Sequence, residues 1–287
     1  TFMPKIRQGI NFSFERSNSG LSSKYVESIN QALKQNQDTI DFYKLGIDYF
    51  QQYECRMEYH TELTTGLNLF AGLQYNYRDP VKHGIMAAST QHREELANQH
   101  FSDFAPYLRL EWTPRQYYYY EGRRKIYIDG NTPTFVLEAT KAIPNVWGTN
   151  SDYGRIEFDA TQNIPIAQKR LLSYRVGAGA FLNQKGEYFI SYHYFTRRQY
   201  ASTWQDNRFG GIFQLLEEYW FSSSPSYIRG HLMYESPYGI FHRSLGPFSK
   251  YIIKERAYMN LLQAQGKSFY TELGYAIANN YINFGVF

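Results

Sequence analysis

An alternation of apolar and charged positions is clearest in residues 152–182. An extended chain places Ile156 and Phe158 on one face there and Glu157 on the other. Residues 163–165 break the alternation, which then resumes, so the segment predicts a hairpin with its turn at residues 163–165. Its strands run to roughly ten residues or more, against about five or six in a soluble sheet and about nine to eleven in a strand that crosses a bilayer. The strand length therefore indicates a membrane protein.

The same two-faced pattern recurs along the rest of the chain. Short turns join most of the segments, and no helix-length spacing separates them, so we expect about twelve antiparallel strands. Residues 18–38 are polar and predict a surface loop or a short helix, while residues 79–99 and 197–208 predict loops. The other expected strands lie at about residues 10–14, 45–60, 67–77, 104–112, 135–139, 188–194, 213–221, 228–234, 253–262, 269–277 and 282–286.

The aromatic content strengthens the membrane interpretation. Tyr and Phe number 28 and 21, and aromatic residues make up 18% of the 287 positions. Tyrosine is typical of the aromatic girdles of outer-membrane barrels, because its ring is apolar and its hydroxyl can hydrogen-bond to water. The mean hydropathy of −0.55 excludes a helical membrane protein, because no stretch approaches the roughly 20 apolar residues that a spanning helix needs.

These patterns together predict an all-β fold. An open sheet edge in lipid would leave backbone groups unsatisfied at several kcal/mol each, so the sheet is expected to close. We expect residues 1–287 to form a single domain, a transmembrane antiparallel up-and-down β-barrel of about twelve strands. The barrel need not be complete within this chain.

Charge and cysteine content narrow the function classes. The formal net charge of +4 is too mild for a nucleic-acid-binding surface, and the single Cys55 allows neither an internal disulfide nor a cysteine-based metal site. Residues 117–120 are four tyrosines followed by cations. Such a block can stack nucleotide bases, but an interfacial belt with cations that reach toward water explains it more simply.

A group of charges on one strand face is the candidate site. Arg155, Glu157 and Asp159 share a face, and we interpret them, together with Arg229, as a charge ladder that lines the lumen. The alternative is a barrel-embedded hydrolase that uses His193 or Glu157. No nucleophile elbow, phosphate loop or metal-ligand spacing accompanies these residues, so we expect no catalytic residue, no cofactor and no metal.

From about residue 104 to its end, the chain resembles an uncharacterised outer-membrane barrel family of Gram-negative bacteria that carries an N-terminal carboxypeptidase-regulatory-like domain. This resemblance implies the outer membrane as location, a preceding β-sandwich domain, further sequence after Phe287 and no established reaction. The motifs that carry it, in order, are Trp112-x-Pro114, Arg124-Lys125, Pro133-Thr134-Phe135, Asp152-Tyr153-x-Arg155-Ile156-Glu157, Gly177-x-Gly179-x-Phe181 and Phe213-x-Leu215-Leu216-x-x-Tyr219-x-Phe221-Ser222.

A second resemblance is to the insertase and two-partner transporter barrels, whose lumen loop carries an Arg-Gly-aromatic motif. The matching residues are 227–231, with His231 in the place of the aromatic residue. The competing interpretation is that Arg229 belongs to an ordinary lumen charge pair.

We therefore expect an integral outer-membrane β-barrel that acts in passage, anchoring or assembly of material at the bacterial surface, and no enzyme. Its expected partners are outer-membrane lipid and lipopolysaccharide, together with other outer-membrane or periplasmic proteins, and no nucleic acid. A soluble Tyr-rich β-sandwich that acts as a binding module is the remaining alternative, and it predicts strands of about five or six residues.

Overall fold

One large antiparallel sheet organises the chain. The computed structural model describes residues 8–20, 49–80, 101–122, 124–128, 130–183, 213, 215–216, 225–237, 254–278 and 283–286. Eleven strands form the sheet in the order β1-β2-β3-β4-β7-β8-β9-β10-β11-β12-β13, and β5 and β6 form a separate pair. The strands are β1 (Gln8–Gly20), β2 (Tyr49–Thr64), β3 (Leu67–Pro80), β4 (Phe101–Trp112), β5 (Tyr118–Glu121), β6 (Arg124–Tyr127), β7 (Thr134–Lys141), β8 (Gly154–Ala167), β9 (Arg170–Asn183), β10 (Ser226–Ser236), β11 (Lys254–Ala264), β12 (Tyr270–Ala278) and β13 (Asn283–Val286).

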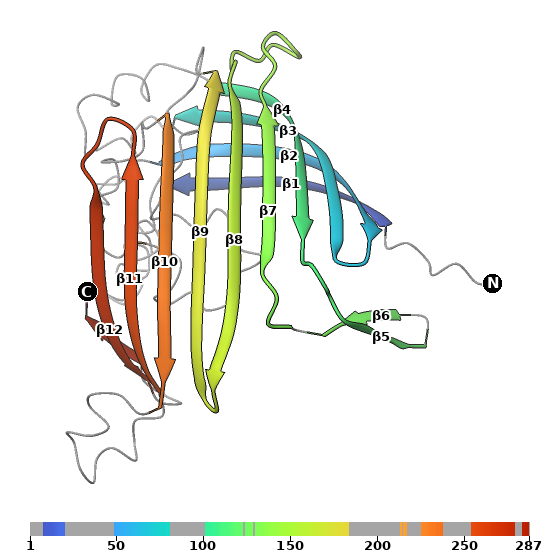
Figure 1. Cartoon of the computed structure of the whole chain (residues 1–287). Helices are drawn as coiled ribbons and strands as arrows, with labels where there is room; N and C mark the ends of the chain where they lie inside the picture. Colours follow the sequence, from blue (N-terminus) through green and yellow to red (C-terminus); the bar gives the residue numbers. More distant parts are fainter. Residues whose placement is uncertain are drawn as a thin grey trace, which may run out of the picture.

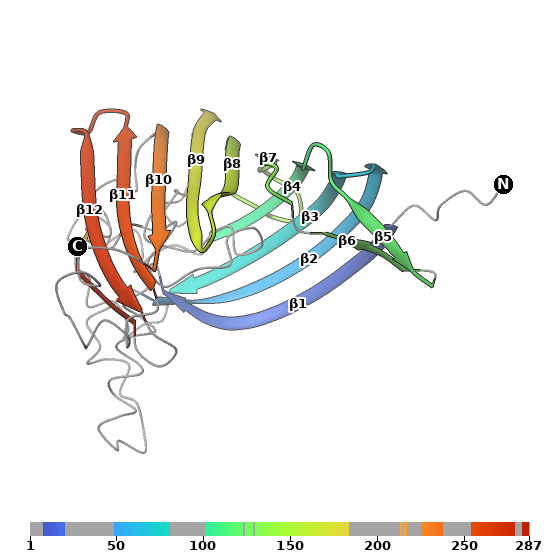
Figure 2. The same cartoon turned by 60° about the horizontal axis from the view of Figure 1, so that its bottom comes forward.

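The sheet is a curled meander (Figures 1 and 2). Consecutive strands along the chain pair with each other, except that β4 pairs with β7 because β5 and β6 form their own pair. In Figure 1, β1–β4 pass behind β7–β9. Within the part of the chain that the structure describes, β1 and β13 are the two edges, and no pairing joins them. The prediction of an all-β antiparallel meander is confirmed, whereas closure is not observed. Across the described ranges, no helix has the length and apolar character needed to cross a membrane.

Most of the strands that the alternation predicted are present, but one turn is wrong. The chain does not turn at residues 163–165, because β8 continues to Ala167 and the turn is formed by Gln168 and Lys169. A register shift between Pro165 and Ala167 lets the strand continue past the proline, which has no N–H to give to the ladder. The break in the pattern therefore marks a bulge near the strand end.

Some sequence predictions fall on residues that the structure does not describe. The strand expected at residues 188–194, His193 and most of the three expected loops lie outside the described residues. The strand expected at residues 213–221 is wrong at its described positions, because Phe213, Leu215 and Leu216 belong to no strand. At the start of the first loop or helix expected, residues 18–20 continue β1 instead.

The tyrosine block forms a hairpin outside the main sheet. β5 pairs with β6, and every residue of β5 is exposed. The hairpin projects from the connection between β4 and β7 (Figure 1). Lys125 and Tyr127 both bond to Glu62 near the end of β2, and Lys125 also bonds to Thr65 at 3.2 Å. A single carboxylate therefore attaches the hairpin to the sheet.

The attachment of the hairpin is expected to weaken in alkali. Burial, and then the hydrogen bond to Glu62, raise the pKa of Tyr127 above its ordinary value of 10.0. A raised pKa in the folded state contributes stability below about pH 10 that is lost as the pH rises through the raised value. The tyrosinate absorbance of the wild type minus that of Tyr127→Phe should titrate above pH 10, and Glu62→Gln should lower its midpoint. A difference that titrates at or below pH 10 would contradict this contact.

Burial along the strands is inverted relative to a water-soluble sheet. We call the face that carries Glu157 and Asp159 the inner face and the face that carries Ile156 and Phe158 the outer face. Glu157 and Asp159 are 4% and 6% exposed, whereas Ile156 and Phe158 are 37% and 40% exposed. Large apolar residues are exposed on most strands of the sheet, including Phe12, Met57, Leu73, Leu108, Leu137, Val176, Ile228, Met259 and Leu273.

The apolar core is correspondingly small and divided. One cluster joins Phe213 and Leu216 to Tyr227, Leu262 and Ala264. Two others centre on Tyr153 and on Tyr258. Polar and charged side chains occupy most of the remaining buried positions, so hydrogen bonds and ion pairs hold much of the interior together.

Candidate functional site

Buried charges gather on the inner face of β8, β9 and β10. Asp159 of β8, Arg175 of β9 and Arg229 of β10 are each no more than 6% exposed. Glu157 and Arg155 extend the group along β8, one strand repeat apart. All four members of the predicted ladder therefore lie in one cluster, and the structure adds Arg175 to it. That this face lines a lumen stays a prediction.

Asp159 is the centre of the cluster. Its carboxylate accepts two hydrogen bonds from the Arg175 guanidinium, at 3.0 and 2.9 Å, and one from Arg229 at 2.7 Å. A planar guanidinium that donates in parallel to both carboxylate oxygens is the strongest common geometry for such a pair. One anion thus links cations from the two strands that follow it in the sheet.

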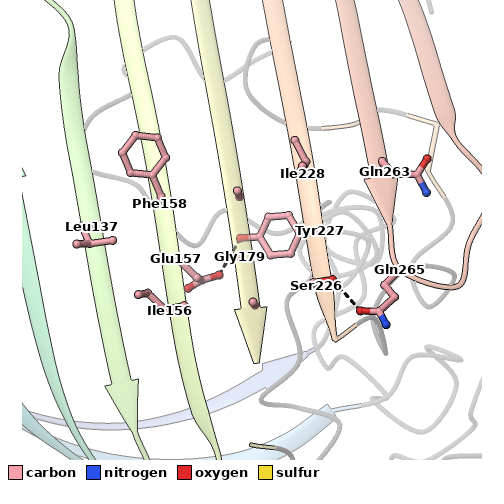
Figure 3. A pocket seen from close by; sticks show the side chains of 12 residues that line it. Leu137, Ile156, Glu157, Phe158, Gly179, Ser226, Tyr227, Ile228, Gln263 and Gln265 are labelled. Carbon is pink, nitrogen blue, oxygen red and sulfur yellow. Dashed lines mark hydrogen bonds between the residues drawn. The ribbon is translucent and has the colours of Figure 1, made fainter. Parts of the chain in front are cut away.

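Glu157 makes the second link between strands. Its carboxylate pairs with Arg155 at 3.0 Å and accepts a hydrogen bond from the Tyr227 hydroxyl at 2.9 Å (Figure 3). Tyr227 lies on β10, whereas Glu157 lies on β8, so this bond passes over β9. The contact joins two strands that are not neighbours.

Glycines on β9 make possible both contacts that cross from β8 to β10, Asp159–Arg229 and Glu157–Tyr227. In the register, Gly177 lies between Asp159 and Arg229, and Gly179 lies between Glu157 and Tyr227. A Cβ at Gly177 would be 2.7 Å from both Arg229 Nε and Asp159 Oδ1, which is closer than real contacts allow. The absence of side chains at these two positions lets β10 reach β8 directly.

The same device occurs in the first half of the sheet. The hydroxyl of Tyr107 on β4 donates to Glu58 on β2 at 2.6 Å, and Gly72 of β3 lies between them in the register. A Cβ at Gly72 would overlap the Tyr107 ring. A row of glutamate, glycine and tyrosine therefore ties three consecutive strands together at two places in the sheet.

Gly177→Ala is expected to lower the free energy of unfolding. The added methyl group meets the Asp159–Arg229 pair, and overpacking of this kind costs about 1–3 kcal/mol. Gly230→Ala is the matched control, because its Cβ finds nothing closer than Leu261 Cβ at 4.0 Å. Urea unfolding of the two variants in detergent or lipid measures the difference, and equal stabilities would contradict the crossing.

A second network extends the inner face toward β12. His231 Nδ1 lies 2.9 Å from Asn260 Oδ1, and Asn260 Nδ2 donates to Glu272 at 2.9 Å. Because the Asn260 amide nitrogen donates to Glu272, its oxygen is the acceptor and His231 carries its proton on Nδ1. The backbone N–H of Leu215 also donates to Glu272, at 2.9 Å. The chain before β10 is thus held against the inner face.

These contacts bear on the catalytic alternative. Glu157 and Asp159 are each bonded to arginine, which leaves neither as an obvious proton donor or acceptor for a substrate. The His231 ring packs against Phe213 with ring centroids 4.7 Å apart and is buried. Among the described residues, no group of three histidine, cysteine or carboxylate side chains is placed to hold a metal ion. These buried contacts connect the strands of the sheet and pair the charges on its inner face.

The Arg-Gly motif that suggested the insertase-type barrels is differently placed. Residues 227–231 lie inside β10, in agreement with the strand expected at residues 228–234, and not in a loop like the one that carries the motif in those barrels. Arg229 instead pairs with Asp159, as the competing interpretation required. The sequence reasoning missed Arg175 and Tyr227. Gly177 and Gly179, at two successive inner positions of β9, are the sequence signal from which contacts between β8 and β10 could have been predicted.

Comparison with known proteins gives a family and a fold. The family model described as "Family of unknown function (DUF5686) C-terminal domain" matches residues 2–277. No curated protein sequence matches the chain. Among solved structures, BamA from Haemophilus ducreyi lacking POTRA domains 1–3 is similar at a TM-score of 0.50 and 10% identity. That match covers 96% of this chain and 52% of the BamA chain, so this chain spans about half its length, and the likeness concerns the fold alone.

Proposed function

This chain belongs to the family of unknown function DUF5686, as its C-terminal domain, and on that premise we propose that it is an integral outer-membrane β-barrel of a Gram-negative bacterium. Its role is the passage, anchoring or assembly of material at the bacterial surface. The BamA-like fold is compatible with this role and assigns no activity to it. Outer-membrane lipid and lipopolysaccharide surround the barrel, other outer-membrane or periplasmic proteins are its partners, and it binds no nucleic acid.

The inverted burial of the strands carries the proposal. Charged Asp159 is 6% exposed, while its neighbour Phe158 is 40% exposed on the opposite face. In water this arrangement is unfavourable on both sides of the sheet, because apolar area stays hydrated and charge is desolvated. In a bilayer the outer face meets hydrocarbon and the inner face meets water or paired charge. Strand length agrees, since β2, β3, β8 and β9 have 14 to 16 residues.

Closure is part of the proposal. The edges β1 and β13 each offer backbone groups that lipid cannot satisfy. A barrel in the membrane therefore requires these edges to pair, either with each other or with further strands. The curl of the sheet brings β1–β4 behind β7–β9, which favours closure over a flat arrangement (Figure 1).

The inner face supports holding and assembly more than free diffusion. Across β8–β12 its charges are bonded to one another or to neutral polar groups such as Asn260, and Phe213 and Leu216 pack against it. The proposed role is non-catalytic, and the bonding of Glu157 and Asp159 to arginine and tyrosine supports it. The soluble β-sandwich is disfavoured, because the sheet strands are mostly longer than the five or six residues usual there.

Fractionation of the native host tests this function first. We expect the protein in the outer-membrane fraction, resistant to carbonate extraction, with faster gel mobility before boiling than after it. Conductance of the purified protein in a planar bilayer then separates open passage from a filled interior. Recovery in the soluble fraction with no mobility shift on heating would overturn the proposal.

A further inference from the structure

The outer face of the sheet is hollowed over β8, β9 and β10. A groove of about 510 Å³ crosses β8, β9 and β10 (Figure 3). Its walls include Phe158 and Ile156 on one side and Ile228 on the other, and its floor is Ala178, Gly179 and Ala180. The hollow lies within the exposed apolar face described above.

The register explains why the hollow lies there. Ala178 of β9 sits between Phe158 of β8 and Ile228 of β10, and the next row places Ala180 between Ile156 and Ser226. Two small side chains in the middle strand are therefore flanked by larger ones on both sides. The groove spans residues 178–180 along β9 and reaches across the sheet from Leu137 on β7 to Gln263 at the end of β11.

The two ends of the groove differ in chemistry. Leu137 and Phe158 lie at an apolar end, and Ser226, Gln263 and Gln265 form a polar rim at the other. Glu157 and Tyr227, hydrogen-bonded to each other, also line the groove. The Ser226 hydroxyl and Gln265 Oε1 are 2.9 Å apart, and Gln263 donates to the backbone carbonyls of Ala264 and Lys267 at 3.2 and 3.0 Å. The rim carries hydroxyl and amide groups and no charge. It lies where β10 begins and β11 ends, at an edge of the outer face.

We propose that this groove binds one acyl chain of a membrane lipid, with the linkage to the headgroup at the Ser226–Gln265 rim. The inference rests on the proposed function, because only a membrane places hydrocarbon against this face. An apolar trough with a neutral hydrogen-bonding rim fits an acyl chain and its ester or amide linkage. The groove is continuous with exposed Ile228, at 62%, and Phe158, at 40%, so lipid meets it without any rearrangement.

Filling the groove tests the site. Ala178→Trp places an indole in the trough, and Val176→Trp places the same indole on the same face of β9 outside the lining residues. Protein reconstituted in phosphatidylethanolamine and phosphatidylglycerol vesicles is released into mild detergent and weighed by native mass spectrometry. Wild type and Val176→Trp should retain one lipid. Ala178→Trp should retain at least about tenfold less, because displacing about two methylene groups is enough for that change.

A second measurement keeps the test decisive if Ala178→Trp does not fold. Phospholipid with a photoreactive acyl chain should cross-link in the wild type to peptides that contain residues 156–158, 178–180 or 228. A parallel arm with purified lipopolysaccharide in the vesicles identifies which lipid supplies the chain. Equal retention by Ala178→Trp and wild type, or cross-links spread evenly over the outer face, overturns the site. Loss of the mobility shift on heating in the wild type overturns the proposed function instead.

Discussion

Removing the Asp159 carboxylate is expected to destabilise the protein more than any other single change on the inner face. Asp159→Ala leaves the guanidinium groups of Arg175 and Arg229 buried without their shared anion. Breaking a buried pair by removing one partner costs about 3–5 kcal/mol, because the remaining charge stays desolvated. Urea unfolding of the reconstituted protein, followed by the mobility shift on boiling, measures the loss.

Two further variants show whether the loss of stability comes from buried arginines that no longer have their anion. Lys141→Ala breaks the exposed Lys141–Asp152 pair, where the lysine is 52% exposed, and should cost only about 0–1 kcal/mol. The triple change Asp159→Leu, Arg175→Met and Arg229→Met removes all three charges together and should recover most of the stability. If Asp159→Ala is no less stable than Lys141→Ala, the cluster has no structural role.

A lysine on the outer face of β2 should be harmful at the middle of the strand and harmless at its end. Met57 and Leu63 lie on that face and are 47% and 54% exposed. They are separated along the strand by about 20 Å. In a bilayer, Met57→Lys should cost about 2–4 kcal/mol and Leu63→Lys about 0–1 kcal/mol, since the cost of a cation depends on its depth.

This pair of variants distinguishes a membrane from water as the surroundings of the outer face. In water, both substitutions are surface changes that fall within about 0.5 kcal/mol. Unfolding of the two variants in lipid vesicles, compared with wild type, gives the difference directly. Equal effects at the two positions would contradict the membrane-spanning orientation of β2.

Alternation alone was sufficient for most of the sheet. An apolar residue at every second position is a property of the strand itself, so β2, β3, β4 and β10 could be placed without knowing their neighbours. The turn after β8 was misplaced because Pro165 was interpreted as an end, whereas a bulge accommodates it. The β5–β6 hairpin was missed because four consecutive tyrosines show no two-residue period.

Only part of the candidate site could be predicted, because alternation describes one strand and not its pairing with others. Arg155, Glu157 and Asp159 share a face of one strand, which the sequence shows directly. Arg229 was included in the predicted ladder, but Tyr227, which reaches Glu157 from 70 positions away, was not, and only the register of three strands brings both residues to β8. Spacing along a chain carries no information on register between distant strands, except where inner glycines such as Gly177 indicate that a neighbour must cross.

The contacts that pass over β9 also predict which positions should change together among sequences of this family. A change at position 159 can be compensated at position 175 or 229, and one at 157 at position 227, because those side chains touch. The backbones involved are two strand spacings apart, about 9–10 Å. Correlated substitutions would therefore connect β8 with β10 as well as with β9, because Gly177 and Gly179 leave no room for side chains between the two outer strands. A topology drawn from such correlations would place β8 and β10 closer together than their backbones are, although β9 lies between them.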